Sequence, residues 1–223
     1  MDKMFSSFRG KSSAGSSVNA NDPDFDEEAR NLWARLNLDP KTKGGDQWNA
    51  LDAIYRHATG GGSIYVGNQT AAQDINILSR HNITHVVNCT HGDSGIPCYH
   101  KGKLRYYVFP IAQWGSFVNR TDESILQFTG PMFDFIEGAI SKGESVLVHC
   151  LAGAHRAGTT GCACLVHFAD MEPNKAIMTA KRLRPIIDPI GSLPELLVRL
   201  QKARTGRKKN ALIGAVKDAS NTR

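Results

Sequence analysis

The segment from Ser145 to Gly161, which reads S-V-L-V-H-C-L-A-G-A-H-R-A-G-T-T-G, is the feature that most constrains how this chain can fold. An apolar run leads to Cys150, and Arg156 follows at the start of a stretch rich in small residues and threonine. This order predicts a buried strand, a tight loop and the first turn of a helix. Because the free N–H groups of a helix N-terminus attract anions, the loop is a predicted phosphate site.

Cys150 and Arg156 suit the chemistry of phosphate transfer. The positive end of the helix and the guanidinium of Arg156 would favour the thiolate form of Cys150, which is the nucleophilic form. A planar guanidinium can also bind two phosphate oxygens at once. Gly153 and Gly158 allow the backbone to turn and to approach the anion closely. The alternative interpretation is a buried strand cysteine followed by an unrelated surface arginine.

The same segment resembles the signature of the cysteine-dependent protein tyrosine phosphatase superfamily, H-C-x5-R, formed here by His149, Cys150 and Arg156. A second stretch, I-Y-V-G-N followed by a helical segment and N-I-T-H-V-V-N-C-T, resembles the opening of the dual-specificity phosphatase domains of that superfamily. Together these stretches extend the resemblance to most of residues 63–203. The resemblance implies an α/β fold whose central, mostly parallel sheet is flanked by helices, with the ligand at the carboxyl ends of the strands.

The resemblance also implies roles for the residues of the loop, without a metal or another cofactor. Cys150 is the expected nucleophile, which forms a phosphocysteine, and His149 is expected to tune the thiolate through a hydrogen bond or, alternatively, to be a core histidine. His155 either faces the entrance, where its protonated form would favour acidic substrates, or points into solvent without a role. The expected phosphate ligands are Arg156 and the backbone of Leu151, Ala152, Gly153, Ala154 and His155.

Two positions depart from the family pattern. Gln113 stands where the family carries the aspartate that protonates the leaving group, and glutamine cannot transfer that proton. The nearest acid is Asp122, which is either the general acid or a helix cap at the surface. Ala157 stands where the family usually carries a hydroxyl that stabilises the departing thiolate, and Thr159 or Thr160 could replace it. Loss of that hydrogen bond, about 1.5 to 3 kcal/mol, would slow the second step by about one to two orders of magnitude.

Cys89, at the end of the apolar run V-V-N-C, is a redox candidate. Some members of the family carry a thiol at this place that forms a reversible disulfide with the nucleophile, and packing in a buried strand is the alternative. The five cysteines are an odd number without zinc-type pairing, which predicts reduced thiols and a cytoplasmic or nuclear location.

The chain is predicted to consist of four parts. They are a disordered leader over residues 1–22, a helical N-terminal extension over 23–60, the catalytic domain over 61–204 and a basic tail over 205–223. In the extension, the stretch from about Pro23 to Pro40 is amphipathic and has acids in its first turn, where they favour the helix dipole. Trp48, Leu51, Ile54 and Tyr55 have the spacing of a second helix. We expect the extension to pack on the domain as a cap, although a partner-binding element is the alternative.

The net charge of +6 is concentrated at the C-terminal end. From Arg199 onward there are eight Lys or Arg residues and one acidic residue, so the basic character belongs to the tail and not to the domain. The tail could bind an acidic partner, anionic lipid or nucleic acid, or could be a solvated helix end. No apolar run approaches the roughly 18 to 20 residues of a membrane span.

The sequence therefore predicts a phosphatase that acts on phosphotyrosine and phosphoserine or phosphothreonine in proteins through a cysteinyl phosphate. A non-protein substrate, such as a phosphoinositide or an RNA 5′ phosphate, is the runner-up, because the basic tail would suit it. A phosphate-binding pseudophosphatase or scaffold is the alternative of another class, motivated by Gln113 and Ala157.

Overall fold

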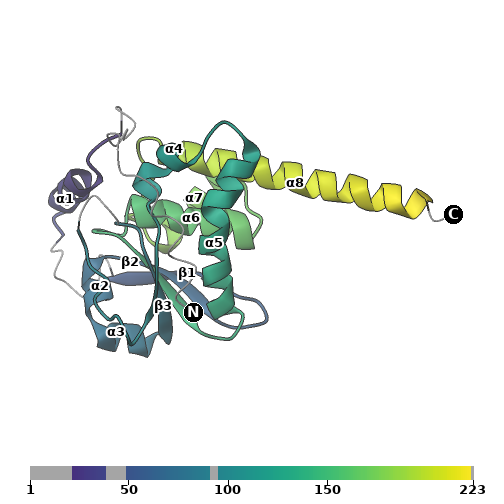
Figure 1. Ribbon diagram of the computed structural model, residues 1–223. Helices are drawn as coiled ribbons and strands as arrows, with labels where there is room; N and C mark the ends of the chain where they lie inside the picture. The colour runs from purple at the N-terminus through teal and green to yellow at the C-terminus, as the bar shows by residue number, and fades with distance from the viewer. Residues whose placement is uncertain (1–21, 39–48, 91–94, 222–223) are drawn as a thin grey trace, which may run out of the picture.

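The computed structural model describes residues 22–38, 49–90 and 95–221 (Figure 1). The described residues form a single sheet with helices on both faces, which confirms the predicted α/β class. In chain order the elements are α1 (Phe25–Arg35), β1 (Leu51–Arg56), β2 (Ser63–Gly67), α2 (Gln69–Gln73), α3 (Ile75–Arg80), β3 (Ile83–Asn88), β4 (Arg105–Val108), the 3₁₀ turn η2 (Ile111–Gln113), α4 (Trp114–Phe117), α5 (Asp122–Ile140), β5 (Ser145–His149), α6 (Arg156–Phe168), α7 (Pro173–Leu183) and α8 (Leu193–Asn221).

The sheet has the strand order β1-β2-β5-β3-β4. Strands β2, β5, β3 and β4 run parallel, and β1 pairs antiparallel with β2 at one edge. β5 is the central strand, and all five of its residues are buried, as expected for an apolar run covered on both faces. The segment that carries the motif therefore lies in the middle of the fold.

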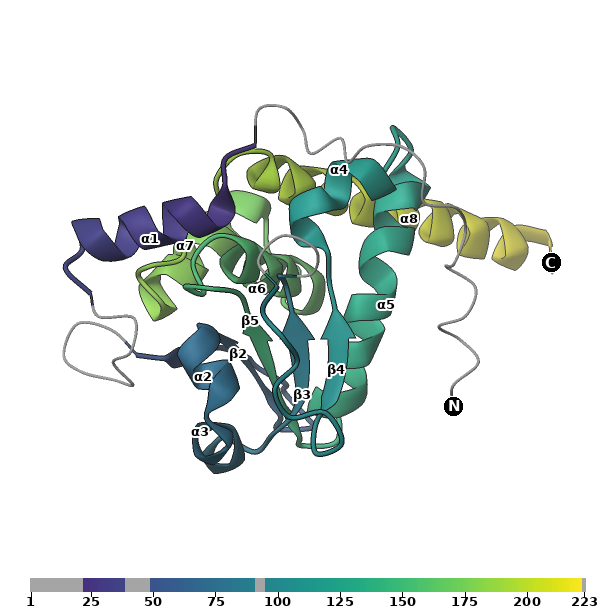
Figure 2. The same ribbon diagram turned by 60° about the vertical axis from the view of Figure 1, so that its left-hand side comes forward.

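The two faces of the sheet are covered by different helices (Figures 1 and 2). Helices α5 and α6 pack on one face and are themselves covered by α7 and α8, whereas α2 and α3 pack on the other face. Alternate side chains of β5 serve the two faces: Val146 and Val148 belong to the larger core with α5 and α6, and Leu147 belongs to the smaller core with α2 and α3.

Helix α1 confirms the first part of the predicted extension. Its N-cap is Asp24, whose side chain accepts hydrogen bonds from the backbone of Asp26 and Glu27, and three acids occupy the first turn. The helix lies at the end of the domain where the parallel strands finish, beside the loop that follows β5 (Figure 2). One face of α1 is buried there.

The predicted second helix of the extension is wrong, because residues 51–56 form strand β1. Leu51 and Ile54 are both buried although they are three positions apart, which is the spacing that suggested a helix. The pairing with β2 is interrupted between Ala53 and Tyr55, and this bulge inserts one extra residue into the strand. A bulged strand can thus imitate helical spacing. The predicted domain boundary at residue 61 also excludes β1 from the sheet to which it belongs; Trp48 lies outside the described residues.

The ends of the chain differ from the predicted division. Of the predicted leader, only Asp22 is described. The boundary between residues 204 and 205 falls inside α8, which continues to Asn221 and projects beyond the body of the domain (Figure 1). The basic residues of the tail are therefore, as far as they are described, part of the last helix. No helix among the described residues has the length and apolar character to cross a membrane.

Candidate active site

The loop from Cys150 to His155 joins β5 to α6 at the carboxyl end of the central strand. The last residue of β5, His149, pairs with Gly67 of β2 on one side and with Asn88 of β3 on the other. The loop therefore leaves the sheet between two neighbouring parallel strands, where α/β proteins commonly bind ligands. The structure brings the predicted site residues of the motif together at this place.

Gly153 gives the loop its curvature. Its φ of +71° lies in the left-handed region, and a Cβ at this position would lie 2.5 Å from the carbonyl oxygen of Gly67. A side chain would therefore meet both backbone strain and a clash. The N–H of Gly153 donates to the sulfur of Cys150 at 3.3 Å, which shows that the amide points to the concave side of the loop.

Arg184 braces the loop from its outer side. Its Nη2 donates to the carbonyl of Ala152 and its Nε to the carbonyl of Gly153, both at 3.1 Å. Because a carbonyl and the N–H of the same peptide point in opposite directions, these bonds turn the amides of Gly153 and Ala154 inward. A third bond, from Nη1 to Asp52 of β1 at 2.7 Å, pairs the buried guanidinium with a carboxylate. The sequence analysis did not predict this role of Arg184.

His155 ties the loop to the segment that follows α7. Its Nδ1 donates to the carbonyl of Asp188 at 2.6 Å, and the amide of Asp188 donates in return to the carbonyl of Ala154 at 3.1 Å. The side chain is buried. Both expectations for His155, at the entrance or in solvent, are wrong, because the ring is a tether inside the fold.

His149 lies fully buried beneath the loop. Burial lowers its pKa to about 4, and the nearby guanidinium of Arg156 acts in the same direction, so the ring is neutral at pH 7. Neither ring nitrogen has a side-chain hydrogen-bond partner in the part of the chain that the structure describes. A hydrogen bond with the backbone of Cys150 acts against the effect of burial on the pKa of His149. The predicted tuning of the thiolate through a hydrogen bond stays a prediction.

Arg156, the first residue of α6, is almost fully buried and faces helix α1. Its Nη2 donates to Oδ1 of Asp26, and the two side chains form an ion pair. The guanidinium also lies 5.9 Å from the ring centroid of Phe25. The sequence analysis missed both contacts, because the acids of the first turn were interpreted only as partners of the helix dipole. Cys150 is 3% exposed beneath this cover.

The hydroxyls near Cys150 do not take over the missing role at Ala157. Thr159 donates to the carbonyl of His155 at 2.7 Å, and Thr160 donates to the carbonyl of Arg156 at 3.0 Å. Each bond reaches back one turn of α6, as helical threonines commonly do. In the described structure neither hydroxyl bonds to the sulfur of Cys150, so the proposed replacements are not in place.

Asp122 is not brought to the loop. It begins α5 at the surface, and its Oδ2 would lie 3.9 Å from a Cβ added to Gly206 of α8. Two residues earlier in α8, Arg204 donates to His167 at the C-terminal end of α6. Asp122 itself is exposed and lies beside α8. The structure therefore places Asp122 as a helix residue of the surface and not as a general acid.

Cys89 lies beside Cys150, as the prediction requires. It follows β3 directly, and its N–H donates to the carbonyl of His149, the residue before Cys150 on the neighbouring strand, at 2.9 Å. Its sulfur lies 3.4 Å from the hydroxyl of Thr160. Burial raises the pKa of the Cys89 thiol to about 12, so this thiol is protonated. Both cysteines are free thiols in the structure.

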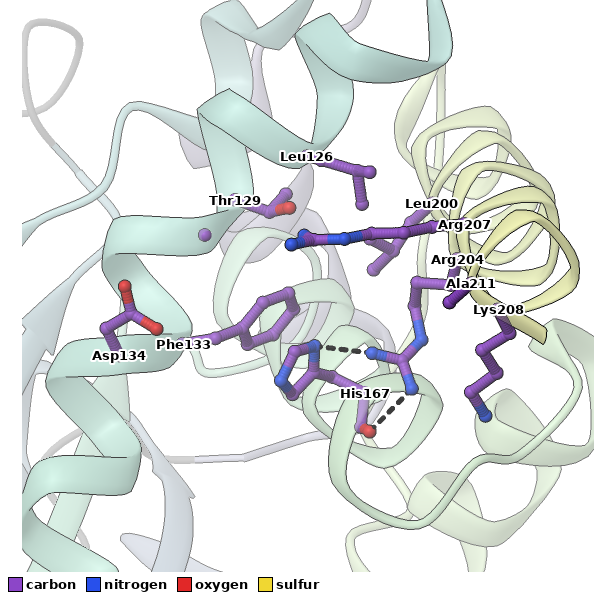
Figure 3. Close-up of a pocket in the computed structure, with 11 residues that line it drawn as sticks. Leu126, Thr129, Phe133, Asp134, His167, Leu200, Arg204, Arg207, Lys208 and Ala211 are labelled. Atoms are coloured by element: carbon purple, nitrogen blue, oxygen red, sulfur yellow. Dashed lines mark hydrogen bonds between the residues drawn. The ribbon is translucent and has the colours of Figure 1, made fainter. Parts of the chain in front are cut away.

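A separate hollow of about 520 Å³ lies between α5 and α8 (Figure 3). The guanidinium of Arg204 donates to Nδ1 and to the carbonyl of His167, at 2.6 and 2.8 Å. Burial and the neighbouring cations Arg204 and Lys208 lower the pKa of His167 to about 4. Arg207 extends across the opening, above Phe133. The basic residues of the last helix thus line a hollow at the end of α6 that is remote from the catalytic loop.

Comparison with known proteins agrees with this geometry. The family described as "Dual specificity phosphatase, catalytic domain" matches residues 64–202, which is more than half of the chain. The human tyrosine phosphatase-like serine/threonine/tyrosine-interacting protein has a similar fold, with a TM-score of 0.55 and 21% identity over 70% of this chain and 97% of that chain.

Two relatives show the same similarity in sequence. Dual specificity protein phosphatase 1 of Arabidopsis thaliana is 29% identical over 140 residues, which cover 63% of this chain and 66% of that protein. Dual specificity protein phosphatase 19 of Mus musculus is 28% identical over 147 residues, which cover 66% of this chain and 61% of that protein. The chain therefore spans a little less than two thirds of the length of either relative.

Proposed function

The chain belongs to the dual specificity phosphatase family, and we propose that it hydrolyses phosphate monoesters on phosphotyrosine and phosphoserine or phosphothreonine residues of proteins. One observation carries the proposal: the N–H of Gly153 is directed at the sulfur of Cys150, and Arg156 begins α6 at the other end of the same short loop. One short loop thus carries a nucleophile and two kinds of anion ligand, which supports the proposal.

In the first step the sulfur of Cys150 attacks phosphorus, so an S–P bond forms while the bond to the substrate oxygen breaks. The loop amides and Arg156 would bind the remaining phosphate oxygens as charge develops on them. In the second step water attacks phosphorus and the thiolate leaves. Arg184 and His155 take part only indirectly, because their bonds to the loop backbone keep the amides turned inward.

The absence of an acid at Gln113 suggests a preference among substrates. A tyrosine phenolate, with a pKa of about 10, leaves more easily than the alkoxide of serine or threonine when no group donates a proton. General acid catalysis typically contributes about a hundredfold or more. We therefore expect phosphotyrosine peptides to react at least about a hundredfold faster than phosphothreonine peptides of the same sequence.

The position of Ala157 suggests that the second step is slow. The hydroxyls of Thr159 and Thr160 are engaged with backbone carbonyls, so the thiolate leaves without a hydroxyl donor. A slow second step would make the phosphocysteine accumulate. The same observation also favours the second candidate function, a phosphate-binding pseudophosphatase, in which the loop binds phosphorylated segments with little or no turnover.

The test compares the purified chain with Cys150→Ser on p-nitrophenyl phosphate and on matched phosphotyrosine and phosphothreonine peptides. We expect product release by the natural chain, with a rapid burst of about one equivalent, and none by the variant. Equal rates for both proteins, together with retained phosphopeptide binding, would contradict the phosphatase function and support the pseudophosphatase function. A phosphoinositide and an RNA 5′ phosphate belong in the same panel, and faster turnover of either would show a non-protein substrate.

A further inference from the structure

Helix α1 is fastened onto the catalytic loop by apolar contacts. Its buried residues Ala29 and Leu32 pack with Ala152 and Ala154 of the loop and with Ile186 beyond it. The partly buried side chains of Trp33, Leu38 and Leu151 surround this small cluster. The cluster is separate from the two cores that flank the sheet, so the middle and the end of α1 pack on the loop and not on the sheet.

A second anchor lies just before α1. The carboxylate of Asp22 accepts hydrogen bonds from the amide and the hydroxyl of Ser192, both at 2.7 Å, where the chain enters α8. Phe25, the first residue of α1, is buried in the larger core. The helix is therefore held at its beginning and along its inner face, and these two attachments orient the first turn toward the loop.

This orientation places the carboxylate of Asp26 on the guanidinium of Arg156. The guanidinium is the group that would bind phosphate oxygens, and a carboxylate offers it the same planar pair of acceptor oxygens and a negative charge. A substrate phosphate carries up to two negative charges and needs the same donor atoms. The two anions would repel each other and compete for the same donors, so both cannot bind Arg156 in this arrangement.

We propose that α1 is a built-in lid, in which Asp26 acts as an internal competitor that must leave Arg156 before a substrate phosphate can bind. The inference rests on the proposed function, because it concerns access to the same loop. A site that is open only part of the time binds its ligand more weakly by the open fraction. The rate measured with a small phosphate ester would therefore be lower than the rate of the open site. A partner that binds α1 and holds it away from the loop would increase the measured rate.

The first test measures tungstate, a tetrahedral oxyanion, by isothermal titration calorimetry. Cys150→Ser is the parent protein, since it removes the thiolate chemistry, and Asp26→Asn is added to it. Loss of a charged hydrogen bond of this kind predicts an affinity at least about tenfold higher. The control is Glu27→Gln, which removes the same charge from the same turn at an exposed position and should change the affinity less than twofold. Equal affinities of the Asp26→Asn variant and the parent would overturn the proposal.

The second test follows the lid itself by hydrogen exchange. Saturating tungstate should increase amide exchange over residues 28–35 of α1, while α7 serves as the reference and remains protected. Asp26→Asn should increase exchange in α1 without tungstate. If α1 keeps its full protection when tungstate is bound, Asp26 does not have to leave and the lid is excluded.

Turnover separates the lid from another role for Asp26. If α1 is a lid, Asp26→Asn should raise kcat/KM for p-nitrophenyl phosphate by about tenfold over the natural chain. If Asp26 instead supplied a proton to the leaving group, the same variant would lower kcat, most strongly for phosphothreonine, and the proposal would fall. If neither protein exceeds the rate of Cys150→Ser, the phosphatase function fails, while the tungstate affinities still decide the lid.

Discussion

Arg156 directly follows the catalytic loop and Arg184 donates to two of its carbonyls, and both arginines are 1% exposed. Each is paired with an aspartate from the first part of the chain, Asp26 for Arg156 and Asp52 for Arg184. The partners of Arg184 are a strand residue and backbone carbonyls, which belong to the permanent fold. The partner of Arg156 lies on a helix outside the sheet, and we propose that it is exchanged for a substrate phosphate. Burial alone therefore does not separate a structural arginine from a functional one; the partners do.

The largest effect is expected for Arg156, the arginine with the proposed functional role. Arg156→Lys keeps the charge but loses the two-pronged geometry, so we expect kcat/KM to fall about a thousandfold or more. The midpoint of thermal unfolding should change by only a few degrees, because lysine can still pair with Asp26. Steady-state kinetics and a melting curve on the same sample provide both values. A fall of less than tenfold would contradict the role of Arg156 as the phosphate clamp.

For Arg184, the arginine with structural partners, we expect a large effect on stability. Arg184→Met leaves the partly buried carboxylate of Asp52 without its cation, and the carbonyls of Ala152 and Gly153 lose their donors. The free energy of unfolding should therefore fall by about 3 to 5 kcal/mol. Denaturant titration measures it. The control is Arg182→Met on the exposed side of α7, which should change the free energy by less than about 0.5 kcal/mol. Similar losses for both variants would show that Arg184 is not the brace of the loop.

The buried ring of His149, beneath the catalytic loop, predicts that the free energy of unfolding depends on pH. His149 has a pKa of about 4 in the fold and about 6.5 when unfolded, so the unfolded chain binds more protons between these values. The contribution of His149 to the free energy of unfolding should therefore have its full value above pH 6.5. It should fall by up to about 3 kcal/mol as the pH approaches 4. His149→Gln should show a smaller fall over this range. His167, whose pKa is lowered in the same direction, contributes equally to both proteins. Parallel curves for the two proteins would refute the prediction.

A hydroxyl restored beside Arg156 should change the kinetics of turnover. Ala157→Ser adds the donor that the departing thiolate lacks, so kcat should rise by about tenfold or more and the burst should shrink. Stopped-flow measurements with p-nitrophenyl phosphate resolve burst and steady state. Ala163→Ser, also buried in α6 but farther along the helix, is the control and should leave kcat unchanged. An unchanged burst in Ala157→Ser would mean that the second step is not limited by the leaving thiolate.

The smallest effect on turnover is expected for Cys89, which we propose as the redox partner of Cys150. Peroxide would oxidise the Cys150 thiolate to a sulfenic acid, and the Cys89 thiol would then form the disulfide with loss of water. Because the pKa of Cys89 is raised to about 12, this step should be slow. Cys89→Ser should leave kcat within about twofold of the natural chain. After peroxide treatment, a reductant should restore the activity of the natural chain and of Cys98→Ser but not that of Cys89→Ser. Peptide mapping without a Cys89–Cys150 link would exclude the pair.

The α/β class, the parallel strands, the motif and the order of most helices could be predicted from the sequence, because each rests on local periodicity and spacing. The failures have a common cause. The bulge in β1 places Leu51 and Ile54 on one side at the spacing of a helix, and only its pairing with β2 reveals the strand. His155 was predicted at the entrance or in solvent, and the bracing role of Arg184 was not predicted, because their partners are backbone carbonyls that no residue pattern reveals.

The sequence by itself determined the strand, the loop and the helix start that place Cys150 and Arg156 around one anion-sized position. Short-range sterics and backbone hydrogen bonding suffice for that, since all the participating groups lie within a few residues of one another. Only the tertiary structure decided which carboxylate meets Arg156. Asp122, 34 positions before Arg156 in the chain, lies beside Gly206 of α8, whereas Asp26, 130 positions away, lies on the guanidinium. Contacts between distant residues depend on how whole elements pack, and here that packing puts an acid on the phosphate-binding arginine.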